Sequence, residues 1–370
     1  MGYFARRAFT QGEHAAMPTL LPVAFWKSAA EAFASDTLEL TILPTEKCNL
    51  RCTYCYEKFE HGKMTAEVIG SVKQLISARA PELRRLKISW FGGEPLLAID
   101  VIEDIGAHAL RLAEENPLLD YSASATSNGV LMTPDVARRI AQAGVGHVHV
   151  SLDGPAAAHD LTRVGGGGRG TFADLESNLL GVRDSDIDML LDLRVHVTPL
   201  NVDMLEEFTD YLVETFLPDD RFNAYFFPIV DLGGPQQGNF RVLRKEDAAR
   251  VVSRLTGRVR DALATMAPRR SLRRARVEVK AGCESPYVCY AAKPNAWVIR
   301  SNGTLSKCTV GFEDPRNDVG RVSRDGSFDL RTDRLQPWMR GWTTGDQLSL
   351  HCPYEGMRDD VRAGLVESRA

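Results

Sequence analysis

Short apolar runs alternate along the first two thirds of the chain with longer segments in which apolar residues recur every three or four positions. The short runs predict strands and the longer segments predict helices, because side chains return to the same face every two residues in a strand and about every 3.6 residues in a helix. The predicted strands are 38–43, 86–91, 122–127, 148–152, 189–197 and 223–230. The predicted helices are 25–33, 66–77, 101–114, 134–143, 172–182 and 202–216.

The regular alternation of strands and helices predicts βαβ units on a parallel sheet. Six strands are too few for the closed eightfold barrel, so we predict an α/β fold with a partial (β/α)6 TIM-like barrel. The alternation stops at the Gly- and Gln-rich segment 231–240, which we interpret as a boundary. The predicted parts are an N-terminal extension over 1–36, the barrel over 37–235 and a small C-terminal domain over 236–370.

The segment after the predicted boundary has a different pattern. It contains a predicted helix at 245–267, a basic run at 269–276 and a hairpin-like pair at 296–300 and 304–308. The basic run is typical of a solvated helix end, with a dock for an acidic peptide as the alternative. Because this segment has few long apolar runs, we expect a bound metal to stabilise it.

Composition narrows the function classes. The 370 residues are 44% hydrophobic and 25% charged, which is ordinary for a folded protein with a full core. Lys and Arg (45) nearly balance Asp and Glu (49), and the net charge of −4 argues against nucleic acid as the main partner. No apolar run reaches the about 18 residues that cross a bilayer, and the start lacks a signal-peptide pattern. We therefore expect a cytoplasmic protein that binds neither nucleic acid nor membranes.

The cysteines need a chemical explanation. One group directly follows the first predicted strand and the other lies in the last quarter of the chain: Cys48, Cys52 and Cys55, then Cys283, Cys289, Cys308 and Cys352. An odd number of cysteines in a long cytoplasmic chain argues for metal binding or catalysis over a disulfide framework. Three thiolates on one short loop suit a [4Fe–4S] cluster whose fourth iron has no protein ligand. By spacing alone, zinc with His61 as a fourth ligand stays open.

The first cysteine group lies in the segment KCNLRCTYC, residues 47–55, which resembles the CxxxCxxC signature of radical S-adenosylmethionine (radical SAM) enzymes. In that family the open iron binds the amino and carboxylate groups of SAM. The resemblance implies that Tyr54 lies near the adenine. Gly92, Gly93 and Glu94 match the family's GGE motif, which implies that they hold the amino group. Taken alone, the glycine pair also fits a tight turn.

Segments after the third and fourth predicted strands also resemble family motifs. The TSNG segment at 126–129 places Ser127 among the expected SAM contacts, and the SLDG segment at 151–154 begins with Ser151. By the same likeness, Ser151 and Arg163 contact the SAM carboxylate or ribose, and a guanidinium suits a carboxylate. Each motif is weak alone, but their order and their positions at strand ends support one another.

The second cysteine group resembles the opening of the SPASM domain, an accessory iron–sulfur module of radical SAM enzymes. The resemblance implies that Cys283, Cys289, Cys308 and Cys352 hold one auxiliary [4Fe–4S] cluster without an open iron. The second auxiliary cluster of a full SPASM domain is not expected, since the chain has no cysteines left for it. The C-terminal part is therefore predicted to be a SPASM/twitch-type auxiliary-cluster domain. A structural zinc at the same cysteines is the alternative.

Together these resemblances imply a radical SAM oxidoreductase that matures peptides. Such an enzyme cleaves SAM reductively to a 5′-deoxyadenosyl radical, which abstracts a hydrogen atom from a ribosomally synthesised precursor peptide and leaves a crosslink or an oxidised residue. The likeness to peptide maturases lies in WFGGEPLL at 90–97 and in the tail. Residues 1–36 are too few for a leader-recognition domain, so a separate recognition protein is expected, together with a flavodoxin- or ferredoxin-type reductant.

Other functions stay open at this stage. One is a radical SAM dehydrogenase or another enzyme acting on a small molecule. Another is a formylglycine-type sulfatase maturase, although Thr309 stands where those relatives carry an Asp. A binding protein with zinc at both cysteine groups is the non-enzymatic alternative. Asp192, His196 and the aromatic residues of 225–227 are candidate side chains inside the barrel, and the sequence identifies no general base.

Overall fold

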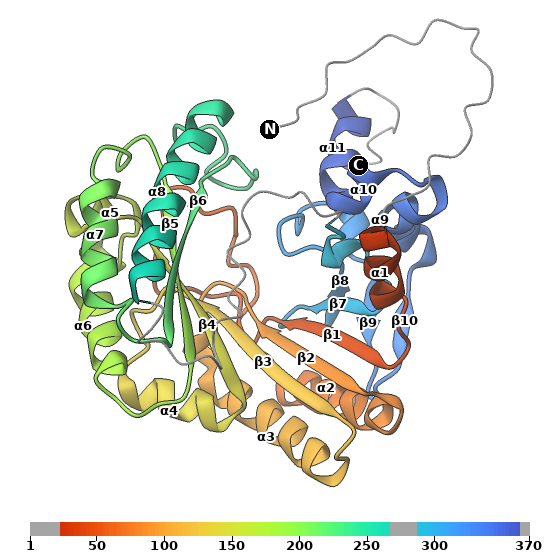
Figure 1. Ribbon diagram of the computed structural model, residues 1–370. Helices are drawn as coiled ribbons and strands as arrows, with labels where there is room; N and C mark the ends of the chain where they lie inside the picture. The colour runs from red at the N-terminus through yellow and green to blue at the C-terminus, as the bar shows by residue number, and fades with distance from the viewer. Residues whose placement is uncertain (1–22, 267–286, 363–370) are drawn as a thin grey trace, which may run out of the picture.

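The computed structural model describes residues 23–266 and 287–362 (Figure 1). Within these ranges one ten-stranded sheet runs through the molecule. In chain order its strands are β1 Thr37–Ile42, β2 Arg85–Trp90, β3 Asp120–Ser127, β4 Val145–Leu152, β5 Leu190–Val197, β6 Phe222–Pro228, β7 Ala296–Ile299, β8 Thr304–Ser306, β9 Gly320–Val322 and β10 Phe328–Leu330. Their order across the sheet is β10-β9-β8-β7-β1-β2-β3-β4-β5-β6.

Strands β1 to β6 are parallel and lie side by side in sequence order. The helices between them are α2 Ala66–Arg79, α3 Ile99–Glu115, α4 Pro134–Gln142, α5 Ala156–Thr162, α6 Phe172–Arg183 and α7 Leu205–Thr215. Most of these helices cover the outer face of the curved sheet (Figure 1), and α8 Lys245–Met266 packs beside α7 and β6. This arrangement confirms the predicted α/β fold with a partial barrel. Of the barrel helices, only α5 was not predicted, because its seven residues are too few to show a helical period.

Alternate residues of the barrel strands face opposite sides of the sheet. On β4, Val148 and Val150 are fully buried in the same apolar core as Ile140 of α4. Their neighbours His147 and His149 point to the other face and are partly exposed. The apolar core therefore fills the space between sheet and helices, and the inner face of the barrel carries polar side chains.

The tail extends the barrel sheet. Strand β7 pairs in parallel with β1, with Trp297 opposite Leu40, and β8, β9 and β10 follow as antiparallel neighbours. Trp297, Leu305 and Trp338 belong to the same apolar core as the barrel. Apolar burial therefore also stabilises the tail, because its short strands gather single apolar residues into one core. The bound metal expected there stays a prediction. The sheet continues across the predicted boundary at 235/236, and the division into domains stays a prediction.

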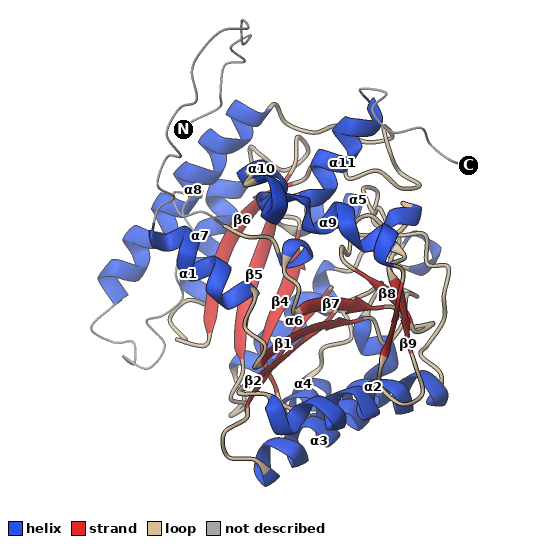
Figure 2. Ribbon diagram, turned by 90° about the vertical axis from the view of Figure 1, so that its right-hand side faces the viewer, coloured by secondary structure: helices blue, strands red, loops and turns tan. Residues whose placement is uncertain are grey.

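Helices complete the described part of the tail: α9 Thr332–Thr344, α10 Gln347–His351 and α11 Pro353–Arg362. They lie on the opposite side of the sheet from α2 and α3 (Figure 2). Helix α1, Val23–Ala32, lies beside them. The ring of Phe33, directly after this helix, lies 4.8 Å from the ring of Trp342 between centroids. The predicted basic run at 269–276 falls outside the described residues. No helix in the described ranges has the length and apolarity that a membrane crossing requires.

Candidate functional site

The loop between β1 and α2 carries the first cysteine group at the carboxyl end of the parallel strands. A bridge between Leu50 and Gly165 fixes this loop against the segment that follows α5. The pKa values of Cys48 and Cys55 are raised to about 12, mainly by burial and in part by the charge of Cys52. Thiols that oppose one another's ionisation are stabilised as thiolates by a bound cation. The chemistry of the three side chains therefore fits a set of metal ligands.

A groove of about 740 Å³ opens beside this set. Cys52, Cys55, Phe59 and Gln236 are among the residues that line it. This volume lies within the range of small-ligand sites. The donor chemistry and the space both fit a cluster on the three thiols with room for a small molecule beside it.

The glycine pair after β2 packs against the cysteine loop. Gly92 has a φ of +118°, which favours glycine, and a Cβ there would lie 2.3 Å from the carbonyl oxygen of Thr45. A Cβ on Gly93 would lie 2.5 Å from the carbonyl oxygen of Lys47. The backbone N–H of Glu94 donates to the same Lys47 oxygen at 2.9 Å. The two glycines thus allow a close backbone contact that holds Glu94 beside the cysteine loop.

Glu94 is fully buried and joins two of the predicted motifs. Its carboxylate accepts from Ser127 Oγ at 2.9 Å and from the backbone N–H groups of Asn128 at 2.7 Å and Leu96 at 3.1 Å. Burial raises the pKa of Glu94, and these donors oppose the rise. Asn128 Nδ2 lies 3.8 Å from Cys48 Sγ. Sequence analysis missed Asn128, whose only signal was its place in the TSNG segment.

Tyr54 belongs to a buried polar cluster around Asp153. Its hydroxyl donates to the Asp153 carboxylate at 2.7 Å and accepts from Arg163 Nη1 at 2.9 Å. His196 Nδ1 lies 3.0 Å from the same carboxylate. Burial alone would raise the pKa of Asp153, but the hydrogen bond with His196 and the charge of Arg163 outweigh it and hold this pKa well below its usual range. Asp153 was not predicted, and its only signal was its place in the SLDG segment.

In this cluster the charge of Arg163 is balanced by Asp153 at 3.6 Å, and one buried donor of Arg163 has no partner among the described residues. Burial lowers the pKa of His196 to about 4, so its imidazole is neutral at neutral pH. Arg163 is 6% exposed, and its Nε has no hydrogen-bond partner within the described part of the chain. A buried N–H without a partner costs free energy unless a ligand accepts from it.

Ser151, at the end of β4, makes a separate contact. Its Oγ accepts from Nη2 of Arg194 on β5 at 2.6 Å. The Nε of Arg194 also lacks a hydrogen-bond partner among the residues described. Arg194 gave no signal in the sequence, because a single arginine in a strand is ordinary. The predicted SAM contacts thus form three groups along the carboxyl edge of the sheet.

Three of the four tail cysteines come together. The backbone N–H of Cys289 donates to the carbonyl oxygen of Leu350 at 2.9 Å, which ties the start of the tail to its end. Burial raises the pKa of Cys289 to about 12, and the charges of Cys308 and Cys352 add to this rise. The three thiols are therefore neighbours. Cys283 lies outside the described residues, so the four-cysteine ligand set stays a prediction.

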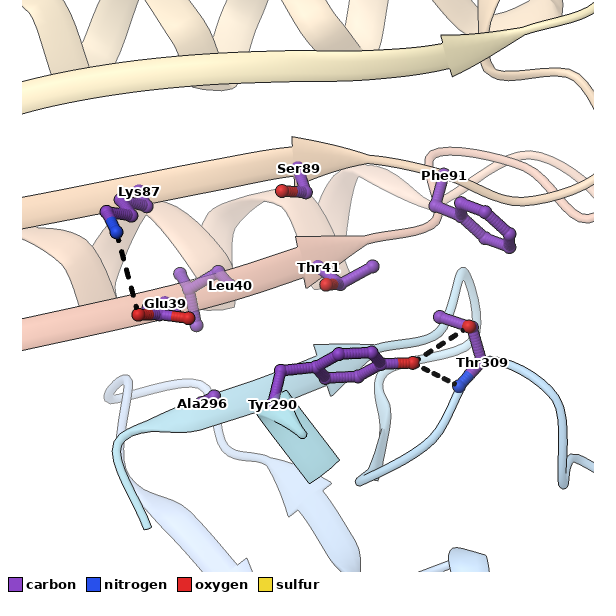
Figure 3. A pocket seen from close by; sticks show the side chains of 9 residues that line it. All are labelled: Glu39, Leu40, Thr41, Lys87, Ser89, Phe91, Tyr290, Ala296 and Thr309. Atoms are coloured by element: carbon purple, nitrogen blue, oxygen red, sulfur yellow. Dashed lines mark hydrogen bonds and ion pairs between the residues drawn. The ribbon is translucent and has the colours of Figure 1, made fainter. Parts of the chain in front are cut away.

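A cavity of about 320 Å³ lies between the barrel and the tail (Figure 3). The inner face of β1 and β2 lines one side, with Phe91 at its end, and Tyr290 and Thr309 line the other. The Tyr290 hydroxyl lies 2.9 Å from the Thr309 hydroxyl and accepts from the Thr309 N–H at 3.0 Å. Because these residues directly follow Cys289 and Cys308, the cavity adjoins the tail cysteines.

The radical SAM superfamily matches residues 42–212. Among curated proteins, the probable GTP 3′,8-cyclase of Methanocaldococcus jannaschii is 30% identical over 181 residues, which cover 47% of this chain and 52% of that protein. The probable GTP 3′,8-cyclase of Archaeoglobus fulgidus is 31% identical over 209 residues, which cover 51% of this chain and 64% of that protein. The chain spans about half the length of several such relatives.

Solved structures match over more of the chain. The structure of anSMEcpe with bound AdoMet and Cp18Cys peptide has a TM-score of 0.62 at 20% identity, with 81% of this chain and 80% of that chain covered. The structure of Streptococcus suis SuiB bound to precursor peptide SuiA has a TM-score of 0.52 at 16% identity, with 82% and 69% covered. At this identity the likeness is one of fold. Residues 1–235 make up less than two thirds of the chain, whereas the two matches cover 81% and 82% of it. The fold likeness therefore extends into the tail.

Proposed function

Because residues 42–212 of this chain form a radical SAM domain, we propose that it is a peptide-modifying radical SAM enzyme whose first cluster is bound by Cys48, Cys52 and Cys55. The domain implies a [4Fe–4S] cluster and SAM. When bound and reduced, the cluster supplies the electron that cleaves SAM to methionine and a 5′-deoxyadenosyl radical, the species that abstracts a substrate hydrogen atom. The observation that carries this proposal is the convergence of three thiols beside the 740 Å³ groove.

The buried polar groups at the carboxyl edge are proposed to hold SAM by its charged ends. A carboxylate offers about four acceptor positions. Protein donors occupy three positions on Glu94, so one remains for the SAM ammonium group. Arg163 and Arg194 each have a buried Nε without a partner in the described ranges, and both suit the SAM carboxylate or ribose oxygens. Ser151 positions Arg194, and Tyr54 is proposed to lie at the adenine.

The tail cysteines are proposed to bind one auxiliary [4Fe–4S] cluster, with Cys283 as the fourth ligand. Four thiolate ligands leave no open iron, so such a cluster suits electron transfer or ordering of the tail. Burial lowers the pKa of the fully buried Lys307 to about 7, and in its charged form this lysine favours the thiolate of Cys289. A flavodoxin- or ferredoxin-type protein is the proposed reductant, and a separate leader-recognition protein is the proposed carrier of the peptide.

The cavity that adjoins the tail cysteines is the proposed place of the substrate. Both solved structures whose fold likeness extends into the tail contain a peptide, Cp18Cys or SuiA. The GTP 3′,8-cyclases match this chain over about half of its length. The fold likeness to these two structures includes the tail, which lines one side of the cavity. This likeness favours a peptide as the substrate.

A second candidate is an enzyme that acts on a small molecule. Its support is the sequence identity to proteins named GTP 3′,8-cyclase, which reaches 35% over 170 residues. These matches are closer in sequence than the peptide-bound structures are. GTP is therefore the small molecule to test first.

Two matched assays separate the candidates. In one, the chain is co-expressed with a candidate precursor peptide, and the peptide is weighed by mass spectrometry. In the other, the reconstituted enzyme is incubated without oxygen with SAM, reductant and GTP. We expect the peptide to lose a hydrogen pair and GTP to remain unchanged, and Cys48→Ala to abolish the peptide change. An unmodified peptide, or a new product from GTP, would contradict the proposal.

A further inference from the structure

The inner face of the barrel carries a second cluster of potential metal ligands, which the proposed SAM chemistry does not use. His147 and His149 lie on β4, and Asp192 lies on β5. Alternate residues of a strand point to the same side, so the two imidazoles share one face. His149 lies opposite Asp192 in the strand register. The ligand atoms of the three side chains all lie within 4.8 Å of one another.

The distances suit a small divalent ion. His147 Nε2 lies 2.9 Å from Asp192 Oδ2, and His149 Nδ1 lies 3.5 Å from the same oxygen. Zinc bonds to nitrogen and oxygen of about 2.0–2.1 Å place neighbouring ligands of a tetrahedral site about 3.3–3.4 Å apart. One observed separation is shorter than that value and the other is longer. Small rotations of the side chains therefore bring the three ligand atoms to bonding distance of one ion.

Asp192 has the surroundings of a ligand carboxylate. Asn223 Nδ2 on β6 donates to its Oδ1 at 3.2 Å, which leaves Oδ2 facing the histidines. Hydrogen bonds of this kind orient metal ligands. Among the described residues, Asp192 forms ion pairs with His147 and His149 but with no lysine or arginine. The next inward residue of β5, Arg194, donates to Ser151 instead.

We propose that His147, His149 and Asp192 bind a divalent transition-metal ion of the zinc type. Two imidazoles and one carboxylate are a ligand set of zinc and of non-haem iron. The side chains of His147 and His149 are 34% and 32% exposed, so a further coordination position faces the open barrel and takes water or an anionic group. Ser151 lies two residues beyond His149, about 7 Å along the strand, so the ion lies next to the proposed SAM edge, on the inner face of the barrel.

Zinc binding by the holoenzyme tests this site, because loaded iron–sulfur clusters keep the cysteines occupied. After titration with Zn²⁺ and buffer exchange, metal analysis is expected to find one zinc per chain. X-ray absorption at the zinc edge is expected to show nitrogen and oxygen ligands at about 2.0–2.1 Å and no sulfur at about 2.3 Å. Asp192→Asn and His147→Gln are expected to weaken zinc binding at least about a hundredfold, and Asn223→Ala about tenfold.

Two controls keep the test decisive. His108→Gln on α3, far from the cluster in sequence and bonded to Ser77, is expected to bind zinc like the unaltered protein. Zinc is expected to raise the unfolding temperature of the unaltered protein but not of Asp192→Asn, whose own unfolding transition shows that it is folded. Absence of zinc, equal zinc binding by Asp192→Asn, or a sulfur ligand shell would overturn the proposal. SAM cleavage does not enter this readout, so an enzyme without cleavage still tests the site, provided that iron analysis shows loaded cysteines.

Discussion

The glycine pair packs so closely against the cysteine loop that one added carbon atom would clash with the loop backbone. A Cβ on Gly93 would lie 2.5 Å from the carbonyl oxygen of Lys47 and 2.7 Å from that of Glu46, so Gly93→Ala forces the loop away. We expect the variant to lose about 1–3 kcal/mol of unfolding free energy and to bind less iron. Urea unfolding and iron analysis measure both effects. Gly62→Ala is the matched control, because its Cβ meets no atom within 4 Å; equal behaviour of the two variants would refute this role.

Buried histidines make stability depend on pH. Burial lowers the pKa of His159 and of His196 to about 4, from about 6.5 in an unfolded chain. Between these values the unfolded chain binds the protons and the folded protein does not, so stability falls as the pH drops from about 6.5 to 4. Each histidine contributes up to about 3 kcal/mol to this fall. Urea unfolding at several pH values should show a shallower fall for His159→Gln, and an unchanged slope would refute the assignment.

The residues that the sequence revealed are those in contiguous motifs. Glu94 and Tyr54 stand in recognisable segments, and the structure places each in a buried polar cluster. Arg194 was missed because its relation to Ser151 exists only between neighbouring strands. His147 and His149 were missed for the same reason, since their spacing acquires meaning only when Asp192 lies opposite.

At the level of elements, the barrel was predictable because its strands and helices are long enough to show their periods. In the tail, the helix at 245–267 and the hairpin-like pair were also predicted, and the structure has α8 and the antiparallel strands β7 and β8 there. The place of these strands in the sheet was not predictable, because it depends on pairing of β7 with β1 across the whole chain. This long-range pairing joins the tail to the apolar core of the barrel.

The β1–β7 junction should make barrel and tail unfold together. Trp297 on β7 is 9% exposed, lies in the common core and stacks under the Lys307 ammonium group at 4.5 Å. Trp297→Ala is expected to lower the unfolding free energy by about 3–5 kcal/mol, as for other large core truncations. Denaturant unfolding followed by fluorescence and circular dichroism measures this. Trp26→Ala, at a 59% exposed position, should change little; two separate transitions would contradict a shared core.

For the whole molecule, the first group of thiols lies beside the 740 Å³ groove, and the second adjoins the cavity that β1, β2 and the tail line. This arrangement predicts about eight irons per chain after anaerobic reconstitution. Cys48→Ala and Cys289→Ala should each lower that number by about half, since each removes a ligand of a different cluster. Zinc in place of iron in the reconstituted protein would support the binding-protein alternative.

The central claim is that Cys48, Cys52 and Cys55 leave one iron free for SAM, and the most direct measurement is SAM cleavage without substrate under anaerobic reduction. The unaltered enzyme is predicted to release 5′-deoxyadenosine and methionine, and Cys48→Ala to release neither. Cys289→Ala, which keeps the first cysteine group intact, is predicted to retain cleavage. Full cleavage by Cys48→Ala would contradict the account.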